Sequence, residues 1–137
     1  MSAASQHVTS ATRKYLLVST GQPSEARRAL LGAPSPPDLC VRSPSREARV
    51  TADVVFAGRY IRTIVEPLFA RRRGGESLGD FTRRCADALF ALYALDTRMA
   101  FVIVDELPST RSSSLLLDDE TLLHLAENLD NSALPEE

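Results

Sequence analysis

Short apolar runs that alternate with helix-forming segments constrain the fold of this chain most strongly. Apolar or β-branched residues run together at 15–18, 39–41, 61–65 and 99–104. Segments able to form helices lie between them, at 22–31, 45–56 and 78–95. Strands that alternate with helices are typical of α/β proteins, because each helix returns the chain to the edge where the next parallel strand begins. The sequence therefore predicts an α/β fold with a mainly parallel sheet flanked by helices.

The length of the chain fits one domain. It has 137 residues, of which 44% are hydrophobic, and this is enough apolar material for one core. Residues 1–13 are rich in Ser, Ala and Thr. We expect them to form a disordered leader, followed by a single domain at 14–135.

Charge and hydropathy exclude some classes of function. The net charge is −2, so a strongly basic nucleic-acid-binding protein is not expected. The longest apolar run, at 88–95, is far shorter than the roughly 20 residues that cross a membrane. No apolar signal core occurs near the N-terminus. We therefore expect a cytoplasmic protein that binds neither membranes nor nucleic acids.

The cysteines and histidines form no metal-binding pattern. Cys40 and Cys85 lie far apart, and we expect both to be free, buried thiols in a reducing compartment. His7 and His124 are the only histidines, and His7 falls in the expected leader. The sequence predicts neither a metal site nor a cofactor.

Charge is unevenly distributed along the chain. Residues 105–137 contain nine acidic residues and a single base, Arg111. Arg71, Arg72 and Arg73 form a basic loop before two glycines. Either the acidic and basic parts contact each other within one fold, or the acidic surface meets a basic partner.

Two local patterns mark the second half of the chain. Ser77 and Asp80 resemble a capping box, which predicts a helix that begins there and runs to about Leu95. The segment 115–129 is ambiguous. Its two apolar stretches, separated by three acidic residues, fit either a hairpin with an acidic turn or a capped helix that begins near Asp118.

Four stretches in this order resemble the histidine phosphatase superfamily, whose fold is called phosphoglycerate mutase-like. Leu-Val-Ser-Thr-Gly-Gln at 17–22 is similar to that family's Leu-Val-Arg-His-Gly-Glu or Gln. The stretch at 43–52 is similar to its Ser-Pro-Leu-x-Arg-Ala-x-x-Thr-Ala. Gly-Glu-Ser at 75–77, followed by Asp80 and Arg84, resembles its Gly-Glu-Ser segment. The strand at 101–106 resembles the one that ends Val-Ser-His-Gly.

The resemblance implies a fold and also the loss of the family's chemistry. It implies a phosphoglycerate mutase-like sheet with a C-terminal antiparallel hairpin at 113–135. The family's reaction uses a histidine nucleophile, with two arginines and a second histidine around the phosphate. The corresponding positions in this chain are Thr20, Ser19, Glu47 and Glu106. No catalytic residue is therefore expected, and the degenerate pocket predicts a non-catalytic protein, a pseudophosphatase, that acts in binding or regulation.

Other readings of the sequence stay open. Arg46 and Arg49 are possible phosphate contacts, and an active phosphomonoesterase would need Thr20 or Cys40 to act beside a base. A structural subunit would bind an acidic partner through the arginines at 71–73. A chain without a selected function is a further alternative.

We expect the partner to be another protein or a second copy of this chain, and the sequence does not identify a small ligand. Two segments, near 66–74 and 106–113, are shorter than the corresponding segments of the family. We expect the second of these to uncover Phe101 and Ile103, and such an apolar patch favours association.

Overall fold

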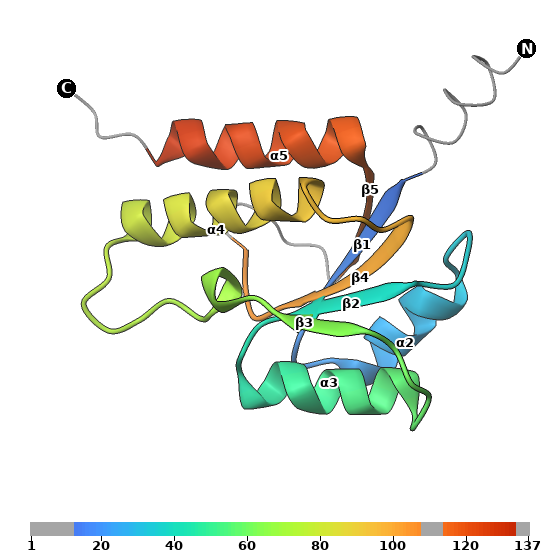
Figure 1. The fold of residues 1–137 in the computed structure, drawn as a ribbon. Coiled ribbons are helices and arrows are strands. Elements are labelled where there is room, and N and C mark those ends of the chain that lie inside the picture. Colours follow the sequence, from blue (N-terminus) through green and yellow to red (C-terminus); the bar gives the residue numbers. More distant parts are fainter. Residues whose placement is uncertain (1–12, 108–113, 134–137) are drawn as a thin grey trace, which may run out of the picture.

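The structure of the protein is a computed structural model that describes residues 13–107 and 114–133 (Figure 1). Its central sheet contains five strands in the order β3-β2-β4-β1-β5. The strands are β1 (Lys14–Ser19), β2 (Leu39–Arg42), β3 (Thr63–Val65), β4 (Met99–Val104) and β5 (Ser114–Asp118). The helices are α2 (Pro23–Leu31), α3 (Arg46–Phe56), the 3-10 turn η1 (Pro67–Phe69), α4 (Leu78–Tyr93) and α5 (Asp119–Ser132).

The sheet is mainly parallel, as predicted. β4 pairs in parallel with both β1 and β2, and β2 pairs in parallel with β3. Among the five described strands, only β5 runs antiparallel, along β1. All six residues of the central strand β4 are buried. A strand buried on both faces explains why 99–104 is a continuous apolar run rather than an alternating one.

Helices cover both faces of the sheet (Figure 1). Odd-numbered residues of β1, such as Leu17, point into a core shared with α4 and α5. Even-numbered residues, such as Leu16 and Val18, point into a core shared with α2 and α3. The alternation of side chains along a strand thus divides the apolar residues between two layers.

The C-terminal segment is not the hairpin that the resemblance implied. Its first part does form an antiparallel strand, β5, but 119–132 is the helix α5. The Asp118 side chain accepts a hydrogen bond from the Thr121 backbone N–H at 2.8 Å and so caps the helix. Leu122, Ala126 and Leu129 recur at helical spacing and are buried in the core shared with α4. This apolar stripe and its cap favour the helix over a second strand.

The expected exposure of Phe101 and Ile103 is also wrong. Both residues are 0% exposed. The Phe101 ring packs edge-on against Phe56 of α3, with ring centroids 5.4 Å apart. Because α2 and α3 cover this face of the sheet, no apolar residue of β4 is open to solvent, although the two segments near 66–74 and 106–113 are short.

Arg13 joins the start of β1 to the ends of two helices. Its guanidinium lies over the rings of Tyr15 and Tyr93 and donates a hydrogen bond to the Tyr93 carbonyl at 2.6 Å. It also forms an ion pair with Asp119 at 3.4 Å. The rest of the expected leader lies outside the described residues.

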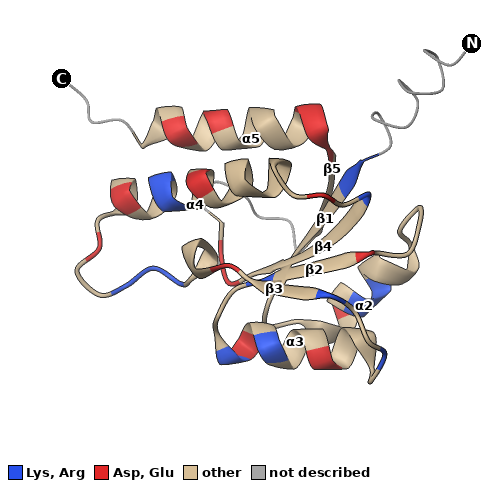
Figure 2. Ribbon diagram, viewed as in Figure 1, with Lys and Arg blue, Asp and Glu red and all other residues tan. Residues whose placement is uncertain are grey.

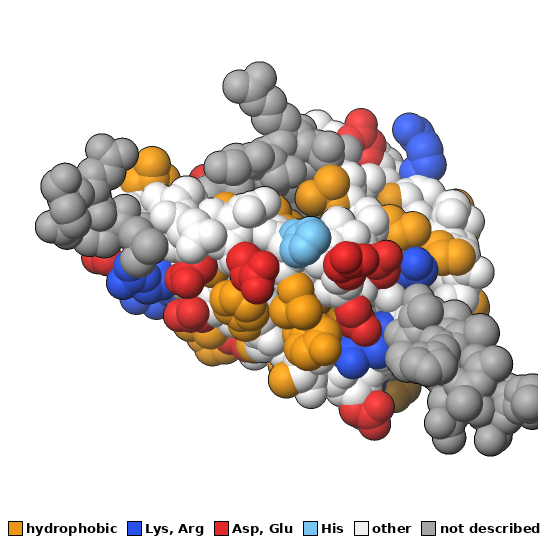
Figure 3. All heavy atoms as spheres, turned by 90° about the horizontal axis from the view of Figure 1, so that it is seen from above, with side chains coloured by type: hydrophobic (Ala, Val, Ile, Leu, Met, Phe, Trp, Pro, Cys, Tyr) orange, Lys and Arg blue, Asp and Glu red, His pale blue; other side chains and the backbone are white. Residues whose placement is uncertain are grey.

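Four of the five acidic residues in the described segment 114–133 lie on α5 (Figure 2). This helix contains four acidic residues, Asp119, Glu120, Glu127 and Asp130, and no Lys or Arg. Seen from above, acidic side chains lie on both sides of the exposed His124, with an apolar patch beside them (Figure 3).

Candidate functional site

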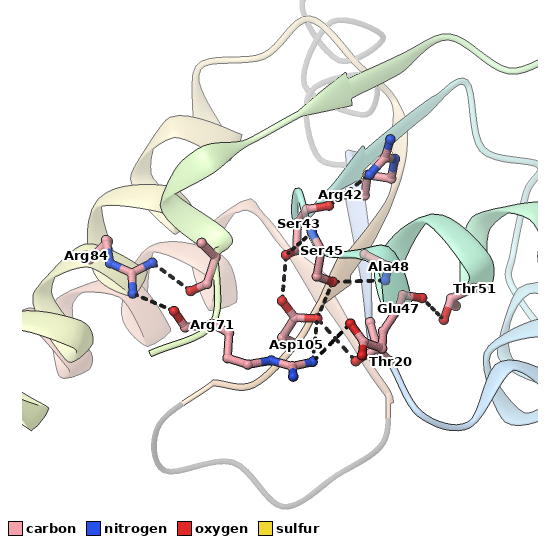
Figure 4. A network of polar contacts seen from close by, with 11 residues as sticks. Thr20, Arg42, Ser43, Ser45, Glu47, Ala48, Thr51, Arg71, Arg84 and Asp105 are labelled. Carbon is pink, nitrogen blue, oxygen red and sulfur yellow. Dashed lines mark hydrogen bonds and ion pairs between the residues drawn. The ribbon is translucent and has the colours of Figure 1, made fainter. Parts of the chain in front are cut away.

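The carboxyl ends of three parallel strands meet at one edge of the sheet. Thr20 follows β1, Ser43 follows β2 and Asp105 follows β4. The strand pairing continues one residue further, because the Thr20 N–H donates to the Val104 carbonyl at 3.0 Å and the Ser43 N–H donates to the Ile103 carbonyl at 2.9 Å. These bonds place Thr20 and Ser43 on either side of Asp105 (Figure 4). Open α/β sheets bind their ligands at such an edge.

A buried carboxylate fills the centre of this edge. The Asp105 side chain is only 1% exposed. It accepts hydrogen bonds from the Ser43 and Ser45 hydroxyls, each at 2.6 Å, and from the Thr20 hydroxyl at 3.3 Å. Three hydroxyl donors from two loops thus compensate the burial of the charge.

The sequence around Pro44 explains how the two serines reach Asp105. Ser45 is the N-cap of α3, and its hydroxyl oxygen accepts a hydrogen bond from the Ala48 N–H at 3.0 Å. The same hydroxyl donates its proton to Asp105. The Ser43 hydroxyl in turn accepts a bond from the Ser45 N–H at 3.2 Å. The start of α3 and the Asp105 carboxylate are therefore parts of one network.

Within the described residues, Arg71 is the one cation that forms an ion pair with Asp105. Its Nη2 lies 3.4 Å from Glu47 Oε1 and 3.7 Å from Asp105 Oδ1. Glu47 stands in the first turn of α3. The side chains of Arg71 and Glu47 are each 54% exposed. The guanidinium therefore lies over the strand ends at the surface, between two carboxylates (Figure 4).

Arg84 holds the loop that carries Arg71. This side chain of α4 donates two hydrogen bonds to the Glu76 carboxylate, at 2.7 and 2.9 Å. It also donates to the backbone carbonyls of Leu68, Ala70 and Arg71, at 3.0, 2.6 and 3.2 Å. The side chains of Arg84 and Glu76 are 11% and 13% exposed. A forked guanidinium can satisfy a carboxylate and a row of carbonyls at once, so Arg84 fixes the backbone of this loop.

The Arg84–Glu76 pair makes stability depend on pH. The hydrogen bonds from Arg84 lower the pKa of Glu76 from 4.5 to about 2. A carboxyl whose pKa is lower in the folded state stabilises the fold above its ordinary pKa, and this stability is lost as the pH falls from about 4.5 towards 2. We expect Glu76→Gln to lose less stability than the wild type between pH 5 and pH 2.5 in urea unfolding. Glu127→Gln, on the exposed side of α5, serves as the control. Equal losses in the wild type and Glu76→Gln would contradict this reading.

A shallow hollow of about 420 Å³ adjoins the strand ends. It is lined by Gly21, Pro23, Arg46, Glu47, Val50 and Thr51. Within the described residues, no group of three His, Cys, Asp or Glu side chains is arranged to hold a metal ion. The residues that line the hollow instead offer one arginine, one carboxylate and an apolar wall.

The predicted site residues are only partly brought together. Thr20 and Glu47 lie at the strand ends and share the network of Asp105 and Arg71. Glu106 is exposed and forms no hydrogen bond or ion pair within the described part of the chain, and the buried carboxylate belongs to its neighbour. Ser19 ends β1 and is half-buried.

The predicted arginines are likewise only partly brought together at the site. Arg46 lines the hollow, and Arg49 is exposed further along α3. Of the basic loop, only Arg71 reaches the strand ends, whereas Arg72 donates to the Glu76 carbonyl and the Arg73 side chain is exposed. Sequence reasoning missed Asp105, Ser43 and Ser45. Their signal was an acidic residue directly after a buried strand and a pair of serines around a proline before a helix.

One solved structure places the fold among known ones. It is a protein from Escherichia coli strain K-12 that is provisionally assigned as an alpha-ribazole-5'-P phosphatase. The two structures match with a TM-score of 0.57 over 67% of this chain and 73% of the other, at 13% sequence identity. The match confirms the predicted phosphoglycerate mutase-like α/β fold, and at this identity it establishes the fold alone. No protein-family model and no curated protein sequence matches the chain.

Among the described residues, no helix is both long enough and apolar enough to cross a bilayer.

Proposed function

We propose that this chain is a non-catalytic histidine phosphatase-like protein that acts in binding or regulation. The observation that carries the proposal is the Asp105 carboxylate, which is 1% exposed and hydrogen-bonded by three hydroxyls at the strand ends. A site built for phosphate presents hydrogen-bond donors and cations to the ligand. Here the hydroxyl donors point at a carboxylate of the protein itself.

The charge of the site also opposes a phosphate dianion. Glu47 and Asp105 share the single guanidinium of Arg71. Two like charges about 4 Å apart repel by roughly 4 kcal/mol at an effective dielectric constant near 20. The guanidinium of Arg71 is therefore already paired with two carboxylates of the protein, and its charge is not free for an anion.

Within the described residues, no cysteine or histidine offers an activated nucleophile at the strand ends. Cys40 is 0% exposed, and its burial raises the pKa of the thiol to about 12. His124 is exposed on α5, where it cannot act on a group at the strand ends. A hydroxyl or thiol without a base is a weak nucleophile at neutral pH.

An active phosphomonoesterase with an altered site is the second candidate. The contact that favours it is the 3.3 Å hydrogen bond from the Thr20 hydroxyl to Asp105, because a carboxylate can act as a base towards a hydroxyl. Against it, both oxygens of Asp105 already accept shorter hydrogen bonds, Oδ2 from Ser43 and Oδ1 from Ser45.

A structural subunit that binds an acidic partner through the arginine loop is the third candidate. Arg71 is engaged by Glu47 and Asp105, so Arg72 and Arg73 would provide most of its contacts. We also propose a cytoplasmic location, since Cys40 and Cys85 are both free thiols.

Hydrolysis of an aryl phosphate tests the proposal. Purified wild type and Thr20→Ala are assayed between pH 5 and pH 8 with and without added magnesium, beside an active phosphatase as a positive control. We expect no turnover above the buffer blank for either protein. Turnover by the wild type that Thr20→Ala abolishes would establish the second candidate instead. Equal turnover by both proteins would indicate a nucleophile other than Thr20 or a contaminating enzyme. Turnover that falls on further purification identifies a contaminant, and turnover that stays constant identifies another nucleophile.

A further inference from the structure

We propose that the strand-end site binds an arginine side chain of a partner protein, and that Arg71 is an internal ligand which the partner displaces. The inference rests on the proposed non-catalytic function, because it assigns the site a ligand in place of a reaction. The site is seen with a guanidinium in it, since Arg71 lies between Glu47 and Asp105 (Figure 4). The planar guanidinium is the cation that best matches carboxylates.

The acceptor at the base of the site is preorganised. The Asp105 carboxylate is fixed by the hydroxyls of Ser43, Ser45 and Thr20, and Ser45 is itself fixed as the cap of α3. A ligand therefore pays no cost for ordering this carboxylate. Glu47, on the exposed side, supplies the second carboxylate from a regular helix.

Arg71 is held loosely in this site. Its distances of 3.4 and 3.7 Å to the two carboxylates exceed those of good hydrogen bonds, and its side chain is 54% exposed. By contrast, Arg84 contacts Glu76 at 2.7 Å and is 11% exposed. Arg84 also holds the carbonyl of Arg71. The Arg71 side chain can therefore leave the site while the backbone of the loop stays in place.

The hollow beside Glu47 gives an incoming side chain room. Pro23 and Val50 provide apolar surface for the methylene stem of an arginine. Arg46 lines the same hollow and repels a second cation. Charge complementarity thus favours a partner segment with one arginine beside neutral or acidic residues over a run of arginines.

An internal ligand lowers the apparent affinity for an external one. The apparent dissociation constant equals the intrinsic constant divided by the fraction of molecules in which the site is open. Removal of the Arg71 side chain should therefore strengthen binding of an arginine peptide, although the substitution adds no contact to the peptide.

Calorimetric titration with a blocked Gly-Arg-Gly peptide tests this inference. We expect Arg71→Ala to bind the peptide about three- to fivefold more tightly than the wild type, because a half-exposed ion pair contributes at most about 1 kcal/mol. Arg73 lies in the same loop, and its side chain makes no contact among the described residues. The Arg73→Ala variant should therefore bind the peptide within about twofold of the wild type. Adding Glu47→Gln to Arg71→Ala should weaken binding at least about fivefold. A blocked Gly-Lys-Gly peptide should bind more weakly than the arginine peptide.

Three outcomes would overturn the inference. They are equal binding by wild type and Arg71→Ala, no saturable binding by a folded Arg71→Ala, and binding that Glu47→Gln does not weaken. Thermal unfolding monitored by circular dichroism shows whether each variant is folded. The phosphatase assay is independent of this titration. Turnover by the wild type refutes the non-catalytic function whatever the peptide does, and failure to bind the peptide removes only the arginine ligand.

Discussion

Replacing Asp105 with alanine should lower the free energy of unfolding by about 3 kcal/mol. The change leaves the hydroxyls of Ser43 and Ser45 without the acceptor that lies 2.6 Å from each. Ser43 is 0% exposed, so its hydroxyl depends on this acceptor in the folded protein. A hydrogen bond to a charged group contributes roughly 1.5–3 kcal/mol, and a buried donor left unsatisfied costs a further roughly 1–3 kcal/mol. Urea unfolding at pH 7 measures the difference.

The neighbouring residue provides a matched control for this prediction. Glu106 carries the same charge one position later but is exposed. Glu106→Ala should therefore change stability by less than about 0.5 kcal/mol. A loss for Asp105→Ala no larger than that for Glu106→Ala would mean that the carboxylate does not organise the strand ends.

Replacing Arg84 with alanine should have the second largest effect, a loss of about 2–3 kcal/mol. The Arg84 guanidinium makes two bonds to Glu76 and three to backbone carbonyls of the loop that carries Arg71. It also lies over the Phe81 ring at 5.2 Å. Because its loss leaves a partly buried carboxylate and several carbonyls without a donor, the cost is that of a broken network.

Limited trypsin digestion gives this prediction a second readout. The loop contains three consecutive arginines, and its backbone is held by Arg84. We expect Arg84→Ala to be cleaved there faster than the wild type under native conditions. Arg83→Ala removes the adjacent exposed arginine of α4 and should leave both stability and cleavage near wild-type values. Matching behaviour of the two variants would refute the role assigned to Arg84.

The layers of the fold could be predicted from the sequence because they depend on local patterns. The run at 99–104 is apolar throughout, and the structure buries it on both faces as the central strand. The Ser77 cap was also predictable, and its hydroxyl accepts the Asp80 N–H at 3.0 Å. The end of the chain was not, because 115–129 fits a strand or a helix locally. Packing of Leu122, Ala126 and Leu129 against the core decides for the helix.

The candidate site was only partly predictable because its contacts join distant parts of the chain. Asp105 bonds to Ser45, which lies 60 positions earlier. Which of the adjacent acidic residues turns inward depends on where β4 ends, and the pattern of the sequence does not fix that to a single residue. Arg71 reaches the site because Arg84 and Glu76 hold its loop, a tertiary arrangement that spacing along the chain does not reveal.

Calorimetric titration of the wild type with inorganic phosphate at low ionic strength tests the central claim most directly. The claim is that the protein's own Asp105 carboxylate, and not a bound phosphate, occupies the strand ends. We predict no saturable binding at phosphate concentrations up to about tenfold above a roughly millimolar dissociation constant, which is typical of a weak specific site. Saturable binding of phosphate that Asp105→Ala or Thr20→Ala alters would contradict the claim, because it would place an anion beside the buried carboxylate.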